Sequence, residues 1–444
     1  MDVLEKALRM LEKYALCDHC LGRQFALLGH GLENSDRGSS IKLSLTLEAN
    51  SLALVKNKEG VRNLKILATN GFSKTAEETL VKMEKRIRKK TLSERCFLCE
   101  DKFQTLEYLV DKAKKKIGNY EYDTFLVGIT LPVTVEERED EFKAEFNITC
   151  GESMKNEFGR TLGKKIAEQT GKDAEYKKPE LVILVNPFTE GVKVQINPLF
   201  VAGRYTKLVR DLPQSKWFCS NCRGKGCEAC DWTGKMYPES VEEFIAKPFL
   251  EETEGQKTSF HASGREDIDA RMLGSGRPFV IEISKPKKRF LDLEKIEKII
   301  NKDAQGKVKV SNLKFANKTV VRKLKKAESS QKEYRVLIEF EKEITGQNLH
   351  LLEEKLANAF VKQRTPLRVL HRRADLTREK HIYEVKLKEL SPKTAEMKIR
   401  CQGGLYVKEL VTGDEGRTTP SVSEFFNSKA KPIRLDVLKV IMDD

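Results

Sequence analysis

Apolar residues recur every three or four positions in several segments of the chain, a spacing that predicts helices with one buried face. In residues 3–16 the apolar side chains fall on a single helical face, and a capping-box pattern opens a second such stripe at 75–90. The same spacing predicts helices at 152–170, 292–301 and 346–362. Helices are therefore expected along the whole chain.

Strand patterns differ between the two halves of the chain. The first half has apolar runs at 122–132 and 180–186 and an alternating segment at 192–196, interspersed with helices. From about residue 241, alternating segments predominate, at 280–283, 308–310, 334–340 and 397–401. These patterns predict an α/β (α+β) protein whose second half is a large mixed or antiparallel sheet flanked by helices.

The net charge of the chain indicates what kind of partner it binds. The 444 residues include 82 basic and 67 acidic side chains, a net charge of +15. A surface rich in Lys and Glu is typical of thermophiles, but the imbalance favours a polyanionic partner, most often a nucleic acid. No apolar run is long enough to cross a membrane, and the charged first helix does not resemble a secretory signal, so we expect a cytoplasmic protein. No feature indicates a protein partner.

Basic residues gather in three clusters, at 82–90, 160–165 and 204–210. In the last cluster, Arg204, Lys207 and Arg210 are interleaved with Tyr205. Basic and aromatic side chains in alternation can hold an RNA backbone and stack on its bases. We expect the three clusters to form one RNA-facing surface, the alternative being solvated faces without a ligand.

Eight of the ten cysteines form C-x-x-C pairs, which in a reducing compartment favours metal binding over disulfides. The pairs are Cys17/Cys20, Cys96/Cys99, Cys219/Cys222 and Cys227/Cys230. Two such pairs supply the four thiolates of a closed, structural zinc site. The first two pairs can share a zinc ion only if the fold brings them together. The last two are so close in sequence that they could face different metals.

The remaining cysteines, Cys150 and Cys401, stand alone in the sequence. Each is expected at the end of a strand as a small buried side chain.

The segment FHASGREDIDARMLGSGRPF (260–279) is the strongest candidate for an active site. It lacks the Lys-Ser/Thr of a phosphate-binding loop and the H-x-E of a zinc deaminase, and the chain has no serine-nucleophile elbow. What remains is Asp267 beside Arg265, with Asp269 and Arg271 beyond. Arg265 would keep Asp267 ionised, as a carboxylate nucleophile requires, and Asp269 would pair with Arg271 to brace the loop. The alternative is a structural Arg–Asp network.

This segment resembles the catalytic-aspartate motif of the pseudouridine synthases. The string GREDIDARMLGSGRPF is similar to that of one branch, the archaeal and eukaryotic tRNA pseudouridine synthase ten family. Other segments also resemble this family: CDHCLGRQFALLGHG, CFLCE, FLVGITLP, NPLFVAGRYTKLVRDLPQSKWFC, HRRADLTREK and GLYVKELVTGDEGRTTPS. The resemblance covers nearly the whole chain.

The resemblance implies three domains. Residues 1–104 would be a helical zinc-knuckle region, and residues 105–240 a THUMP-like RNA-binding domain with the second cysteine cluster. Residues 241–444 would be the catalytic domain, built on a mixed, largely antiparallel sheet.

The resemblance also implies roles for individual residues. Asp267 matches the nucleophile, and Tyr334 matches the tyrosine that stacks on the target base. Lys408 takes the place of the basic partner of the aspartate. Tyr406 and Leu435 match residues that line the uracil pocket.

The implied substrate is tRNA, modified in the T-loop at uridine 55 and also at uridine 54. The implied reaction needs no organic cofactor, so zinc would be structural. Two alternatives stay open: a non-catalytic tRNA-binding or RNA-processing adaptor, and a THUMP-linked methyltransferase or thiolation enzyme. The absence of a glycine-rich cofactor loop weighs against the second alternative.

Overall fold

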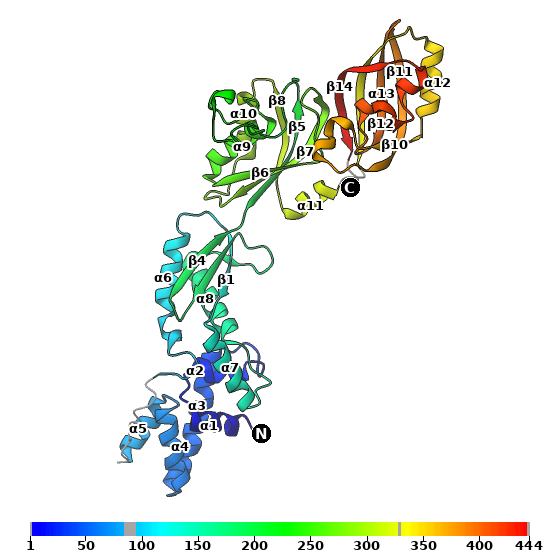
Figure 1. Ribbon diagram of the computed structural model, residues 1–444. Coiled ribbons are helices and arrows are strands. Elements are labelled where there is room, and N and C mark those ends of the chain that lie inside the picture. Colours follow the sequence, from blue (N-terminus) through cyan, green and yellow to red (C-terminus); the bar gives the residue numbers. More distant parts are fainter. Residues whose placement is uncertain (1, 84–94, 327–329, 442–444) are drawn as a thin grey trace. The chain divides into compact units, whose positions relative to one another are not determined.

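The computed structural model describes residues 2–83, 95–326 and 330–441, which form two compact units (Figure 1). The first unit spans Met1–Asn197 and the second Pro198–Asp444. The boundary therefore lies at 197/198, whereas the sequence led us to expect boundaries at 104 and 240. Residues 198–240 belong with the second unit because β5 (Leu199–Lys207) is hydrogen-bonded on both sides within its sheet.

Helices make up most of the first unit. They are α1 (Val3–Lys13), α2 (Asp18–Gly22), α3 (Asn34–Leu54), α4 (Lys58–Thr69), α5 (Lys74–Lys82), α6 (Leu106–Ile117), α7 (Val133–Glu145) and α8 (Met154–Thr170). Helices α2 and α3 pack backbone to backbone, because a Cβ at Gly22 would lie 1.8 Å from the Asn34 carbonyl oxygen. This contact holds the first cysteine pair close to the core.

A small sheet completes the first unit. Its strands are β1 (Thr124–Ile129), β2 (Asp173–Ala174), β3 (Leu181–Asn186) and β4 (Gly191–Ile196), in the order β2-β1-β3-β4. Strand β1 is parallel to β2 and β3, and β4 is antiparallel to β3. Helix α8 begins at the N-cap Ser153, as the pattern at 152–170 predicts. The strand expected before Cys150 is wrong: helix α7 and a loop precede this half-buried residue.

A ten-stranded mixed sheet forms the second unit. Besides β5, its strands are β6 (Lys257–Ala262), β7 (Arg271–Ser284), β8 (Val308–Ala316), β9 (Gln331–Phe340), β10 (Phe360–Arg364), β11 (Thr377–Ser391), β12 (Thr394–Gln402), β13 (Thr418–Thr419) and β14 (Ala430–Ile441). The order is β13-β10-β11-β12-β9-β14-β7-β5-β8, with β6 paired to β7. All these pairs are antiparallel except β14 with β7, so the predicted mixed, largely antiparallel sheet is confirmed.

The second unit has two halves, and each half has its own helices packed on the sheet (Figure 1). Helices α9 (Val241–Thr253) and α10 (Leu293–Asp303) pack near β8, and α12 (Gly346–Leu356) packs on β11. Each half has its own apolar core, and Tyr334 on β9 borders both. The candidate site therefore lies where the two halves of one sheet meet. Within the described residues, no helix has the length and apolar character needed to span a bilayer.

Candidate active site and metal centres

The middle of the candidate segment, residues 263–270, is a loop that joins β6 to β7 and is anchored from beneath. Glu266 is only 4% exposed; its carboxylate accepts hydrogen bonds from the Tyr205 hydroxyl (2.9 Å) and from Nε of Arg277 (2.8 Å). Gln214 donates to the Tyr205 hydroxyl (2.7 Å) and to the Gly264 carbonyl (3.1 Å). Because Glu266 points inward, the next side chain, Asp267, points outward and is 33% exposed.

Two cations contact the carboxylate of Asp267. The guanidinium of Arg368 and Nζ of Lys408 each lie 3.3 Å from it. Arg368 is itself held by Glu409, whose Oε1 lies 2.6 Å from Nε. Lys408 also donates to both oxygens of Asp269, at 2.8 Å. Glu409 and Asp269 therefore hold in place the two cations that orient Asp267.

The pairing expected for Asp269 is wrong. Arg271 instead donates from Nε and Nη2 to Asp436, at 2.9 Å each. Asp436 also binds Arg210 (2.7 Å) and Arg335 (3.1 Å). Burial alone would raise the pKa of Asp436, but the three arginines lower it to about 2. This cluster ties the middle of β14 to the start of β7.

Arg265 lies beside a tryptophan. Its guanidinium is 4.9 Å from the centre of the Trp217 ring, a cation–π distance. Trp217 lies two residues before Cys219, the first residue of the second cysteine cluster. Arg265, which was expected to keep Asp267 ionised, thus contacts an aromatic ring beside that cluster.

A cavity of about 460 Å³ opens above Asp267, within the size range of small-ligand sites. The six residues that the sequence singled out all line it: Arg265, Asp267, Tyr334, Tyr406, Lys408 and Leu435. Leu435 is 8% exposed and Tyr334 is half-buried. Burial raises the pKa of Tyr334, so its phenol is neutral near pH 7. The cavity combines two carboxylates, Glu266 and Asp267, with cations, two aromatic rings and an apolar wall.

Sequence reasoning missed several residues of this site. Arg368 lies 101 residues from Asp267, and no local motif marks it. Glu266 and Arg277 form a buried ion pair that the sequence did not predict, although both lie in the candidate segment 260–279. Asp436 carried a usable signal, because it is an acidic side chain inside the apolar pattern of a strand, next to Leu435.

Part of the RNA-facing surface predicted at 204–210 is wrong. Tyr205 and Lys207 are 0% exposed because they lie on the face of β5 that is turned into the core of the second unit. Nζ of Lys207 donates to the carbonyls of Leu212 (2.7 Å) and Ile268 (2.9 Å), and burial lowers its pKa to about 8. Lys207 thus braces the loop from inside, whereas the half-buried Arg204 donates to the Ser275 carbonyl of β7 at 2.6 Å.

The other two basic clusters belong to the first half of the chain, and the cations of the one at 160–165 form ion pairs. Arg160 binds Glu152 at 2.6 Å, Lys164 pairs with Glu33, and Lys165 pairs with Glu107. These cations are already partly neutralised within the first unit. Most of the cluster at 82–90 lies outside the described residues.

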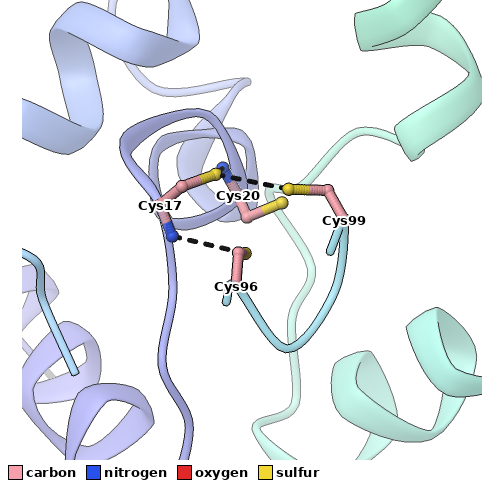
Figure 2. Close-up of side chains that lie close together, drawn as sticks. All are labelled: Cys17, Cys20, Cys96 and Cys99. Carbon is pink, nitrogen blue, oxygen red and sulfur yellow. Dashed lines mark hydrogen bonds between the residues drawn. The ribbon is translucent and has the colours of Figure 1, made fainter. Parts of the chain in front are cut away.

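The fold brings the first four cysteines together (Figure 2). The sulfur atoms of Cys17, Cys20, Cys96 and Cys99 all lie within 4.8 Å of one another, and those of Cys17 and Cys99 are 3.6 Å apart. Metal–sulfur bonds of about 2.3 Å in a tetrahedron place the sulfurs about 3.8 Å apart. The Cys17 N–H donates to Cys96 Sγ at 3.3 Å. The four thiols therefore fit one tetrahedral metal ion.

A buried arginine supports a metal at this first cluster. Arg23 is 0% exposed and follows Cys20 by three residues, which places both on one helical face. Nη1 of Arg23 donates to Glu139, but Nε and Nη2 have no hydrogen-bond partner. Burial alone would lower the pKa of Arg23, whereas Cys20 and Glu139 raise it. Four thiolates around a divalent ion carry a net charge of about −2, which Arg23 would offset.

The second cluster also converges on one point. Cys219, Cys222, Cys227 and Cys230 have their sulfurs within 4.8 Å, with single distances of 3.7 to 3.9 Å. The backbone N–H groups of Gly226 and Gly234 each donate to a sulfur at 3.2 Å. The two pairs therefore face one shared position, not two.

Comparisons with known proteins agree with the geometry. The family model described as "Pus10, C-terminal" matches residues 200–441, and that of the archaeal Pus10 THUMP domain matches residues 109–186. A protein of Methanocaldococcus jannaschii named tRNA pseudouridine synthase Pus10 is 46% identical over 97% of this chain and 93% of its own length. One of the same name from Methanothrix thermoacetophila is 41% identical over 99% and 94%. The resemblance inferred from motifs is confirmed: this chain belongs to the Pus10 family of tRNA pseudouridine synthases, which are isomerases.

Proposed function

We propose that this chain isomerises uridine 55, and also uridine 54, in the T-loop of tRNA, with Asp267 as the nucleophile. The observation that carries the proposal is the placement of Asp267, which faces a cavity between Arg368 and Lys408. The two cations orient the carboxylate, and an aspartate carboxylate can act as a nucleophile. The choice of the two uridines rests on the family resemblance.

The reaction rearranges one nucleotide and imports nothing. The bond from the ribose carbon to N1 of uracil breaks, the base rotates, and a bond forms from the same carbon to C5. C5 loses a proton and N1 gains one, so no oxidant or organic cofactor is required. Asp267 attacks the bound nucleotide to start this sequence and is released at its end.

The cavity walls hold the nucleotide outside its stack. Extruding a base costs a few kcal/mol, and stacking on an aromatic ring recovers about 1–3 kcal/mol. Tyr334 supplies that ring, and Leu435 supplies the apolar wall beside it. Because burial raises the pKa of Tyr334, we assign it to stacking and to hydrogen-bond donation rather than to the role of a base.

We further propose that each cysteine cluster holds one structural zinc ion. Four thiolates leave no coordination position for water, so neither zinc takes part in the isomerisation. The residues to which we assign the chemical step, Asp267 and its two cations, belong to the second unit.

The nucleophile is tested by a matched pair of variants. Asp267→Asn should lower the rate of pseudouridine formation by about 10⁴-fold or more, while tRNA affinity changes by less than about threefold. Asp269→Asn is the control: it loosens Lys408, so it should lower the rate without abolishing it. Activity in the Asp267 variant and none in the Asp269 variant would show that the wrong aspartate was chosen.

The adaptor alternative and the target positions are tested with the wild-type protein. An adaptor would bind a T-loop transcript and leave every uridine unchanged. Transcripts with cytidine at position 54 or at position 55 show which uridine is converted. We expect pseudouridine at the remaining uridine in each transcript.

A further inference from the structure

Two lysines line the cavity on the side formed by β9 and β11. They are Lys332 on β9 and Lys380 on β11, and both are half-buried. Among the residues that the structure describes, no carboxylate lies within 4.0 Å of either amine. Neither amine therefore forms an ion pair with a described side chain.

Three other cations that line the cavity differ from these two lysines. Arg277 binds Glu266 at 2.8 Å, Arg368 binds Glu409 at 2.6 Å, and Lys408 binds Asp269 at 2.8 Å. Each of these cations has a carboxylate that holds it in place. Lys332 and Lys380 are thus set apart from them by the absence of a described acidic partner.

The two amines lie close to further positive charge. Burial and the charge of Arg277 lower the pKa of Lys332 to about 8, and Lys380 acts in the same direction. Like charges in a half-buried site destabilise it unless an anion joins them. An anion at this position would relieve the repulsion and restore full protonation of Lys332.

Two glycines leave room for these amines. A Cβ at Gly264 would lie 2.9 Å from Nζ of Lys332, and a Cβ at Gly404 would lie 3.2 Å from Nζ of Lys380. Both glycines have positive φ angles, +80° and +91°, which other residues rarely adopt. Because neither glycine has a side chain, each amine can lie close to the backbone at the cavity wall.

Strand register places these amines on the face that carries Tyr334. Lys332 is paired with Cys401, and Cys401 with Ile382, two residues after Lys380. Paired residues and residues two apart share one face of a sheet. Tyr334 follows Lys332 by two residues, about 7 Å along the strand. That spacing leaves room for a ribose between a base on Tyr334 and an anion on Lys332.

We propose that Lys332 and Lys380 form a subsite for a phosphodiester of the RNA backbone, next to the nucleotide that is isomerised. The proposal rests on the proposed function, since it places the target base on Tyr334. Phosphate oxygens are strong acceptors for ammonium groups, and lysine binds them as a point charge. The subsite would fix the ribose between two anchored ends, the base and the phosphate.

The first test compares Lys332→Gln with the wild type. We expect tRNA affinity and kcat/KM to fall about tenfold, with kcat at saturation nearly unchanged. The dependence of log affinity on log salt should become shallower by about one unit, because one phosphate contact is lost. Lys332→Arg should restore most of the affinity. Lys380→Gln should act in the same direction and provides a second variant if Lys332→Gln folds poorly.

Lys398→Gln is the matched control. Lys398 is an exposed lysine on β12, next in sequence to the buried Met397 and Ile399 and therefore on the opposite face of the sheet. Its replacement should change neither affinity nor the salt dependence. An equal loss in this variant would mean that the effect is general charge, and the subsite would be overturned.

The second test changes the RNA. T-loop RNAs are prepared with a single neutral methylphosphonate linkage at each position around the target uridine. One linkage should weaken binding to the wild type about tenfold and cost nothing further in Lys332→Gln. If every neutral linkage costs the same in both proteins, no phosphate contacts Lys332 and the proposal fails.

Binding is measured in the Asp267→Asn background, so that catalysis does not enter. A loss of affinity in Lys332→Gln without any isomerisation by the wild type would support the subsite and overturn the proposed function. If the wild type isomerises uridine but replacing Lys332 or Lys380 changes neither affinity nor salt dependence, the proposed function is supported and the subsite is overturned.

Discussion

The two cysteine clusters have the same four ligands in different surroundings. The first joins residues that are 82 positions apart, Cys17 and Cys99, and three of its cysteines are at most 1% exposed. The second closes a segment of twelve residues, Cys219–Cys230, and two of its cysteines are half-exposed. A cross-link that closes a long loop removes more entropy from the unfolded chain than one that closes a short loop. The first cluster is therefore expected to stabilise a whole unit, and the second only its own segment.

Their neighbours differ as well. The first cluster lies in the core of its unit, beside the buried Arg23. The second lies at the surface, where Trp232 is 73% exposed. A bridge between Phe218 and Lys235 closes the base of this second segment, and Trp217 next to it contacts Arg265 of the catalytic loop. Two clusters with identical ligands thus differ in what they contact: the first packs in the core of its unit, and the second lies beside the loop that carries Arg265.

The largest effect is expected at the first cluster. Cys99→Ser should remove one zinc per chain and destabilise the first unit by several kcal/mol, because metal binding there is part of folding. Loss of helical circular dichroism at lower temperature would report it. Both tryptophans of the chain, Trp217 and Trp232, belong to the second unit, so their emission should stay unchanged.

Cys150→Ser provides the control for this variant, because Cys150 belongs to neither cluster. It should keep both zinc ions and the stability of the first unit. Full zinc content in Cys99→Ser would contradict the assignment of this cluster as a metal site.

Arg23→Met should have the next largest effect. The change leaves Glu139 buried without its guanidinium partner, although Lys143 still lies 2.8 Å from it. Removing one member of a buried ion pair costs about 3–5 kcal/mol, and loss of an outer partner weakens metal sites about 10–100-fold. Zinc release to a chelator measures the second effect.

Arg62→Met is suited as the control for Arg23, since Arg62 forms an exposed ion pair with Glu12. It should cost less than about 1 kcal/mol. If zinc release is equally fast in both variants, Arg23 does not offset the charge of the cluster.

Cys222→Ser should act locally. It should remove the other zinc ion, shift the tryptophan emission to longer wavelength and change the stability of the chain by less than about 1 kcal/mol, because the loop is short. Pseudouridine formation should slow about three- to tenfold through the loosened catalytic loop. Unfolding of the first unit in this variant would break the distinction between the clusters.

The smallest effect is expected for Trp217→Leu, which keeps both metal sites. Loss of the contact with Arg265 removes about 0.5–1 kcal/mol, or a two- to fivefold change in rate. Trp232→Leu, at the exposed end of the segment, should leave the rate unchanged. Equal rates in the two variants would mean that the second cluster does not support the loop.

The sequence by itself determined the features that depend on local spacing. The helices at α1, α8 and α10, four strands of the large sheet (β7, β8, β9 and β12) and the four C-x-x-C pairs follow from residues that are near one another in the chain. The register of Asp267 within its motif marked the segment that lines the cavity. Periodicity records which face of an element is buried, and this information is local.

The tertiary structure decided which partners meet. It placed Arg368 on Asp267 across 101 residues, gave Asp269 to Lys408 rather than to Arg271, and closed each cysteine cluster around one position. It also buried Tyr205 and Lys207 of β5, in a segment whose sequence resembled an RNA-binding surface. Spacing along a strand cannot tell which of its faces the rest of the chain covers. That depends on its neighbours, and only the folded chain brings them together.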